Sequence, residues 1–249
     1  MSLARVSKQV RNLEQRLHQA PLLRTIPVIL SDSKAKYLAN TIDWSSHPDN
    51  KIFWWWKSGA DTETQFTWLK ENLESKIQEL SSQHITIYIW LGTCDLTEKT
   101  GKFIKLRSVN NERVNYICET YRQIYKFLSD YPTIKVVFLE LPYYSIYLWN
   151  LFQQHLEPEQ FRVQDRLLEC QIAEVNKFIR ETNILLRVHS PDFGLDLLKV
   201  RKHHGRPPVY SNNYGLYIDG IHPHPYLARL WLIRILLRIV EDCQNKDLL

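Results

Sequence analysis

Two short polar segments carry residue types that could perform nucleophilic chemistry. The first is Ser31-Asp32-Ser33, and the second, far along the chain, is Asp219-Gly220-Ile221-His222-Pro223. A carboxylate three residues before a histidine can orient the imidazole, which can then take a proton from a nearby hydroxyl. The residue types and their spacing predict a triad with Ser33 as nucleophile, His222 as general base and Asp219 as the orienting carboxylate.

Each member of this predicted triad also has a purely structural interpretation. Asp219 could cap a turn, His222 could bond a core carbonyl, and Ser33 could be the N-cap of a helix. Ser33 follows the apolar run 26–30, which predicts a buried strand. Open α/β sheets place their ligands at the carboxyl ends of such strands, so the position of Ser33 favours the catalytic interpretation.

Strand-like and helical patterns alternate along the chain. Strands are predicted over residues 26–30, 51–56, 85–91, 134–141 and 185–189. Helices are predicted over residues 2–19, from residue 62 onward, and over 111–129, 164–182 and 225–241. This alternation predicts an α/β fold: a three-layer α/β/α sandwich around a five-stranded parallel sheet in the flavodoxin-like order.

The predicted first helix has a heptad pattern of apolar residues. These are Leu3, Val6, Val10, Leu13 and Leu17, which step by three and four. Two interpretations are open, an amphipathic helix packed on its own domain or the end of a coiled coil that would join copies of the chain. We therefore expect a helix over residues 1–20, a candidate for homo-oligomer contacts, followed by one α/β domain over residues 21–249.

The composition argues against a membrane-spanning protein and against a metal-binding or disulfide-linked one. The chain has 249 residues, a net charge of +5 and ordinary hydrophobic content, and its apolar runs are shorter than the roughly 18 residues that a membrane span needs. Its four cysteines lack metal-site or disulfide spacing, and no acidic co-ligand pattern accompanies its clustered histidines. We expect no cofactor, no metal, no membrane span and an intracellular location, cytoplasmic or nuclear.

Four segments, each following a predicted strand or lying in a loop, together resemble the motif blocks of the SGNH (GDSL-like) hydrolases. They are Ser31–Ser33, Ser58–Thr62, Gly92–Asp95 and Asp219–His222. The resemblance covers about residues 26 to 235 and implies an SGNH hydrolase domain over 21–249. It also implies a serine esterase that acts on a small ester or acylated substrate, with an oxyanion hole built from Ser33, Gly59 and Cys94.

The chain departs from this family at two positions. Ser31 replaces the first glycine of the first block, and Cys94 stands where the family has asparagine. A thiol is a weaker hydrogen-bond donor than an amide, and losing one oxyanion donor typically costs about 2.7–4 kcal/mol. The sequence therefore predicts a slow hydrolase, one with a donor from elsewhere, or a fold kept for binding. Cys94 itself has no evident basic partner that would make it a nucleophile.

Two further segments concern the substrate. The aromatic stretch 142–152 could wall an acyl pocket, stack nucleic-acid bases, or pack in the core or a dimer contact. We assign four residues to the substrate pocket as a working hypothesis: Asp32, Gly92, Tyr143 and Tyr144. A basic cluster forms a possible nucleic-acid patch, with a solvated loop as the ordinary alternative: Lys199, Arg201, Lys202 and Arg206.

The alternative function is therefore an SGNH-fold module with weak or no catalysis that binds nucleic acid. The chain resembles two such variants: the RNA-binding domain of the insect germ-plasm organiser Oskar, and the esterase-like domain that some LINE retrotransposons carry behind a coiled coil. The Oskar domain has lost the catalytic residues, whereas this chain keeps Ser33, Asp219 and His222. The heptad pattern and the basic cluster favour the retrotransposon variant.

Overall fold

A four-stranded parallel sheet forms the centre of the molecule. The computed structural model describes residues 2–17, 22–39, 41, 51–80, 84–203 and 205–244. The strands lie in the order β2-β1-β3-β6, with bounds β1 Ile26–Ser31, β2 Phe53–Trp56, β3 Ile85–Trp90 and β6 Ile134–Phe138. This order matches the first four positions of the predicted flavodoxin-like sheet.

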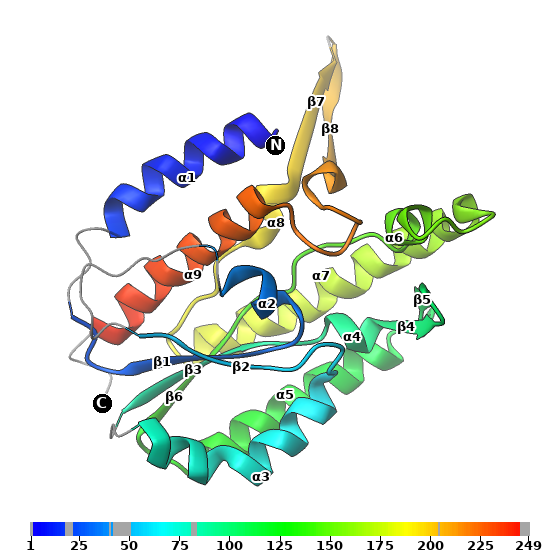
Figure 1. The fold of residues 1–249 in the computed structure, drawn as a ribbon. Helices are drawn as coiled ribbons and strands as arrows, with labels where there is room; N and C mark the ends of the chain where they lie inside the picture. Colours follow the sequence, from blue (N-terminus) through cyan, green and yellow to red (C-terminus); the bar gives the residue numbers. More distant parts are fainter. Residues whose placement is uncertain are drawn as a thin grey trace.

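Helices flank both faces of the sheet, as Figure 1 shows, which confirms the predicted α/β class. One face is covered by α3 (Thr62–Leu80), α5 (Glu112–Ser129) and α7 (Arg162–Leu185), whose apolar residues share one core. The other face is covered by α2 (Lys34–Leu38), α8 (Phe193–Leu197) and α9 (Pro225–Gln244), which share a second core.

The side chains of β3 explain why helices are needed on both faces. All six residues of this strand are buried. Ile87 and Ile89 enter one core, whereas Tyr88 and Trp90 enter the other. Successive strand residues point to opposite faces, so a continuous apolar run requires cover on both sides.

The prediction of a fifth strand over residues 185–189 is wrong. α7 extends to Leu185, and a turn follows in which Arg187 has a left-handed φ of +56°. No strand is assigned at these positions, although the side chain of Val188 is fully buried. Burial is thus limited to Val188, since Leu185 is 82% exposed, and the backbone turns away from the extended conformation.

Asparagine side chains supply bonds at the edge of the sheet where a fifth strand would lie. The Asn183 amide accepts from the Phe138 N–H at 3.1 Å and donates to the Phe138 carbonyl at 2.7 Å. Asn176 bonds the N–H and carbonyl of Leu141 in the same way, at 2.7 and 2.8 Å. A primary amide offers both a donor and an acceptor, so two side chains of α7 satisfy this edge.

The first helix, α1 (Leu3–Leu17), packs along α9 of the same chain (Figure 1). Val6, Val10 and Leu17 are buried there, and Glu14 forms an ion pair with Arg229. These contacts favour the interpretation of an amphipathic helix packed on its own domain. They do not support the predicted homo-oligomer contact, and residues 18–20 of the predicted helix lie outside the described part.

The most apolar predicted helix, α9, belongs to the core. Leu230, Trp231 and Ile235 are fully buried, and Arg234 on the same helix forms an ion pair with the buried Asp196 at 2.6 Å. Among the described residues, no helix combines the length and the apolar character needed to cross a membrane.

Candidate active site

All four predicted segments contribute to one pocket of about 360 Å³. Ser33, Gly59, Cys94 and His222 line it together. Ser33 follows β1 and Cys94 follows β3, so the pocket lies at the carboxyl edge of the sheet, as the sequence predicts. Ser33 occupies the N-cap position of α2, but its hydroxyl makes no capping hydrogen bond.

Asp219 holds the imidazole of His222 through one ring nitrogen. Its Oδ2 lies 2.6 Å from His222 Nδ1, and its Oδ1 accepts from the backbone N–H groups of Ile221 and His222 at 3.0 and 2.7 Å. Burial raises the pKa of Asp219, but these hydrogen bonds outweigh burial and bring the pKa below its ordinary value. The residue is therefore a carboxylate at neutral pH, and the Nε2 side of the ring is left for the pocket.

The loop that carries this pair is docked on α6 (Ile146–Phe152). Gly220 has a φ of +93°, and a Cβ at this position would lie 2.7 Å from Leu148 Cβ and 2.8 Å from the Trp149 nitrogen. Ser145 N–H donates to the Gly220 carbonyl at 2.9 Å. Only glycine satisfies both the left-handed backbone and this close approach.

Two aromatic side chains flank the imidazole. Tyr37 from α2 stacks on His222 with ring centroids 4.4 Å apart, and Trp149 meets the ring at a steep angle with centroids 5.7 Å apart. Both side chains also line the pocket. They restrict the ring to one orientation, in addition to the bond from Asp219.

A buried ion pair joins the segment after β1 to the segment after β3. Lys34 Nζ contacts the Asp32 carboxylate and donates to Thr93 Oγ1 at 2.6 Å. The backbone N–H of Lys34 also donates to Asp32 at 2.9 Å, and both charged side chains are almost fully buried. Removing one partner of a buried pair leaves an uncompensated charge, so this pair fixes where Ser33 and Cys94 lie relative to each other.

A second buried carboxylate joins the segment after β3 to the start of α3. Asp95 accepts from the Thr62 N–H at 3.0 Å and from the Thr62 hydroxyl at 2.7 Å. Burial raises the pKa of Asp95 to about 6, although the hydrogen bonds from Thr62 lower it. Gly59 lies three residues before Thr62, so Asp95 links the loops that present Cys94 and Gly59.

Cys94 is a neutral thiol in this setting. Burial, reinforced by the negative charge of Asp32, raises the pKa of its thiol to about 12. The thiolate is the nucleophilic form of cysteine, so this shift agrees with the expectation that Cys94 is not a nucleophile. Its S–H remains available as a weak donor to the pocket.

The four residues assigned to the substrate pocket do not line this pocket. Asp32 is the buried partner of Lys34, and Gly92 is a buried glycine with a φ of +106°. Tyr144 is buried in the core and donates to the Thr93 carbonyl at 2.9 Å, while Tyr143 lines a separate pocket beside α7. Trp149 is the residue of the aromatic stretch that the structure brings to His222.

The basic cluster lies on a hairpin outside the pocket. β7 (Leu198–His203) pairs antiparallel with β8 (Arg206–Asn212), and Figure 1 shows the hairpin projecting from the body of the molecule. Lys199, Arg201 and Lys202 are exposed on it. The side chain of Arg206 lies outside the described part of the chain.

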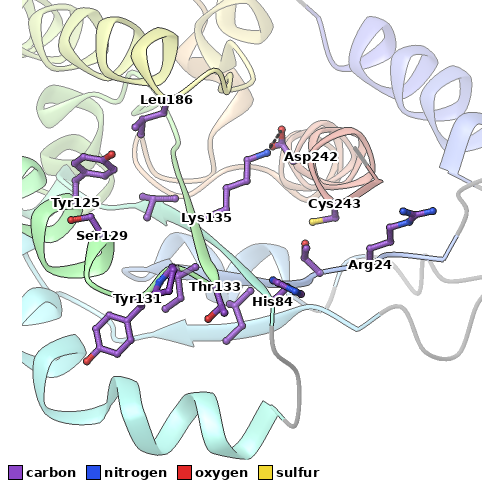
Figure 2. Close-up of a pocket in the computed structure, with 15 residues that line it drawn as sticks. Arg24, His84, Tyr125, Ser129, Tyr131, Thr133, Lys135, Leu186, Asp242 and Cys243 are labelled. Carbon is purple, nitrogen blue, oxygen red and sulfur yellow. Dashed lines mark ion pairs between the residues drawn. The ribbon is translucent and has the colours of Figure 1, made fainter. Parts of the chain in front are cut away.

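A second hollow of about 440 Å³ lies at the opposite edge of the sheet (Figure 2). Its lining includes Thr25, Ile85 and Ile134, at the amino ends of three strands. Lys135 points toward Asp242, with Nζ 3.7 Å from the carboxylate. None of the predicted site residues lines it, so the candidate chemistry belongs to the carboxyl edge.

Solved structures with this fold have hydrolase descriptions. A GDSL-like lipase from Bacteroides thetaiotaomicron matches with a TM-score of 0.56 and 15% identity, over 95% of this chain and 98% of that chain. The lipase/acylhydrolase from Enterococcus faecalis matches with a TM-score of 0.53 and 15% identity, over 90% and 99%. No family model and no curated protein matches the chain. None of these comparisons supports the predicted retrotransposon link.

At 15% identity, these matches show a shared architecture. They cover nearly all of each chain, with the helix-flanked parallel sheet in common. The chain therefore has the fold of the GDSL-like lipases and acylhydrolases.

Proposed function

We propose that this chain is a serine hydrolase of carboxylic esters, with Ser33 as the nucleophile. The observation that carries the proposal is the His222 ring, bonded to Asp219 at 2.6 Å and lining the same pocket as Ser33. The Ser33 hydroxyl makes no hydrogen bond with the described residues, so it is free to turn toward the imidazole. The similarity in fold to lipases and acylhydrolases supports the same reaction class.

The reaction proceeds in two stages. Ser33 Oγ attacks the ester carbonyl carbon while His222 Nε2 takes the hydroxyl proton. The tetrahedral intermediate collapses, the bond to the alcohol oxygen breaks, and His222 returns the proton to the leaving alcohol. Water then attacks the acyl-serine with His222 again as base, which releases the carboxylic acid and regenerates Ser33.

The oxyanion of each tetrahedral intermediate is stabilised by the backbone N–H groups of Ser33 and Gly59. Within the described part of the chain, neither N–H donates to a protein acceptor. Gly59 has a φ of +75°, a conformation that glycine adopts without strain. The Cys94 thiol is the third and weakest donor, so we expect a low rate of turnover.

Covalent labelling tests the nucleophile. A fluorophosphonate probe should phosphonylate Ser33, and peptide mass spectrometry should locate the adduct there. Ser33→Ala should abolish labelling, and His222→Ala should slow it by roughly 10²–10⁴-fold, the usual contribution of a general base.

Two other serines serve as comparisons in this labelling experiment. Ser75→Ala is the matched control, because Ser75 is exposed on α3 away from the pocket, and it should label at the wild-type rate. Ser58 lines the same pocket as Ser33. An adduct on Ser58, or no adduct on folded protein, would contradict the assignment of Ser33.

Substitutions of Cys94 test whether this position belongs to the oxyanion hole. Cys94→Asn supplies the amide donor of the resembled family, and we expect kcat for a phenyl ester to rise by up to about 10²-fold, the lower range for one oxyanion donor. Cys94→Ala removes the weak thiol donor and should not raise the rate. A Cys94→Asn enzyme no faster than Cys94→Ala would exclude this position from the oxyanion hole.

A second candidate function is nucleic-acid binding by the hairpin of β7 and β8. The segment 198–212 contains four Lys or Arg residues and no Asp or Glu, and the hairpin projects from the body of the molecule (Figure 1). A two-stranded basic ribbon can contact phosphates or enter a groove. This function is independent of the proposed hydrolysis.

Fluorescence anisotropy with single- and double-stranded oligonucleotides tests the hairpin. Binding should weaken steeply with salt, and the combined change Lys199→Gln, Arg201→Gln and Lys202→Gln should reduce the magnitude of the log–log salt slope by about 2–3. Lys70→Gln, Lys76→Gln and Lys126→Gln together are the matched control for net charge. No binding at 50 mM salt would exclude this candidate.

A further inference from the structure

The candidate active site has an excess of positive charge. Three cationic side chains line the pocket: Lys36 of α2, Lys99 of β4 (Thr97–Thr100), and Arg107, which directly follows β5 (Phe103–Leu106). None of the described residues that line the pocket carries a carboxylate. These three residues lie apart in the sequence, so no local pattern predicts that they meet at one pocket.

The cations have few partners within the protein. Lys36 and Lys99 form no ion pair with any other described residue, and Arg107 donates to the Cys94 carbonyl at 3.4 Å. All three side chains are exposed at the pocket. Their charges are therefore available to a bound molecule.

The carboxylates close to the pocket have partners of their own: Asp32 pairs with Lys34, and Asp95 accepts from the Thr62 hydroxyl at 2.7 Å. Asp61 accepts from the N–H and hydroxyl of Thr64 at 2.9 and 2.6 Å. Glu98 pairs with Lys105 at 2.8 Å, and Asp219 is bonded to His222. Burial raises the pKa of Asp61, but its hydrogen bonds with Thr64 and the charge of Arg107 bring the pKa below its ordinary value. Lys105 lowers the pKa of Glu98, and Arg107 lowers it further. These carboxylates therefore offset the charge of Arg107 in part, and that of the two lysines remains.

We propose that the substrate is an ester that carries an anionic group, a carboxylate, sulfate or phosphate, close to the scissile bond. This inference rests on the proposed hydrolase function. The apolar side chains of Ile104, Trp149 and Ile221 line the same pocket as the three cations. A cleft of one charge sign with low-dielectric walls concentrates ligands of the opposite charge and raises their association rate.

Matched ester pairs test the inference. In the first pair, 4-sulfophenyl acetate carries the anion on the alcohol and phenyl acetate is neutral. In the second pair, the monophenyl ester of adipic acid carries the anion on the acyl group and phenyl hexanoate is neutral. Each kcat/KM is divided by the rate of the same ester with hydroxide, which removes differences in intrinsic reactivity. The pair with the larger preference identifies the side on which the cations act.

At low salt, we expect at least one anionic ester to be preferred by about tenfold or more. At 1 M salt, where the Debye length is about 3 Å, most of this preference should disappear. Lys36→Gln, Lys99→Gln and Arg107→Gln should each lower the anionic-to-neutral ratio by about two- to fivefold, the usual effect of one exposed charge pair. Lys126→Gln, an equal change of charge on the far end of α5, should leave the ratio as in the wild type.

The outcomes separate the two proposals. An enzyme that labels at Ser33 but hydrolyses the members of both pairs equally, at any salt concentration, overturns the anionic substrate and leaves the hydrolase intact. Preference without any effect of the three cation variants also overturns it, because the pocket charges would then not be its cause. No labelling and no hydrolysis of any of the four esters overturns the hydrolase, and the anionic substrate with it.

Discussion

The hydrogen bond between Asp219 and His222 is the interaction on which the proposed chemistry depends. At 2.6 Å it fixes one ring nitrogen, and it can do so because Gly220 lets the loop sit directly against the start of α6. Tyr37 and Trp149 hold the faces of the ring. The imidazole is therefore oriented by side chains of the chain itself, which lowers the entropic cost of the reaction.

Buried polar groups beside the pocket hold the other loops of the site in place. Asp32 and Lys34 join the segment after β1 to Thr93, and Asp95 joins the segment after β3 to Thr62. Such groups are costly to bury unless they are paired. Here each pairing connects two segments that are distant in the sequence, so the cost of burial is offset by contacts that set the geometry of the pocket.

Local patterns in the sequence predict much of this arrangement. The strand ends carry Ser33 and Cys94, and the spacing of Asp219 and His222 already implies their contact. Long-range contacts are what the sequence does not contain: the bonds of Asn176 and Asn183 to the sheet edge, the burial of Lys34, and the convergence of Lys36, Lys99 and Arg107 on the pocket. The aromatic stretch 142–152 shows what local patterns cannot predict. Tyr144 and Trp149 are both aromatic residues of this stretch, but Tyr144 is buried in the core and Trp149 lines the pocket.

A crystal structure of the phosphonylated protein would show whether Ser33, His222 and the two backbone N–H groups act together. We expect a bond from phosphorus to Ser33 Oγ and a phosphonyl oxygen about 2.7–3.1 Å from the backbone nitrogens of Ser33 and Gly59. Cys94 Sγ should lie beside the same oxygen, and His222 Nε2 should face the Ser33 oxygen. An adduct whose phosphonyl oxygen points away from both nitrogens, or a His222 ring turned from Ser33, would contradict the proposed catalytic site.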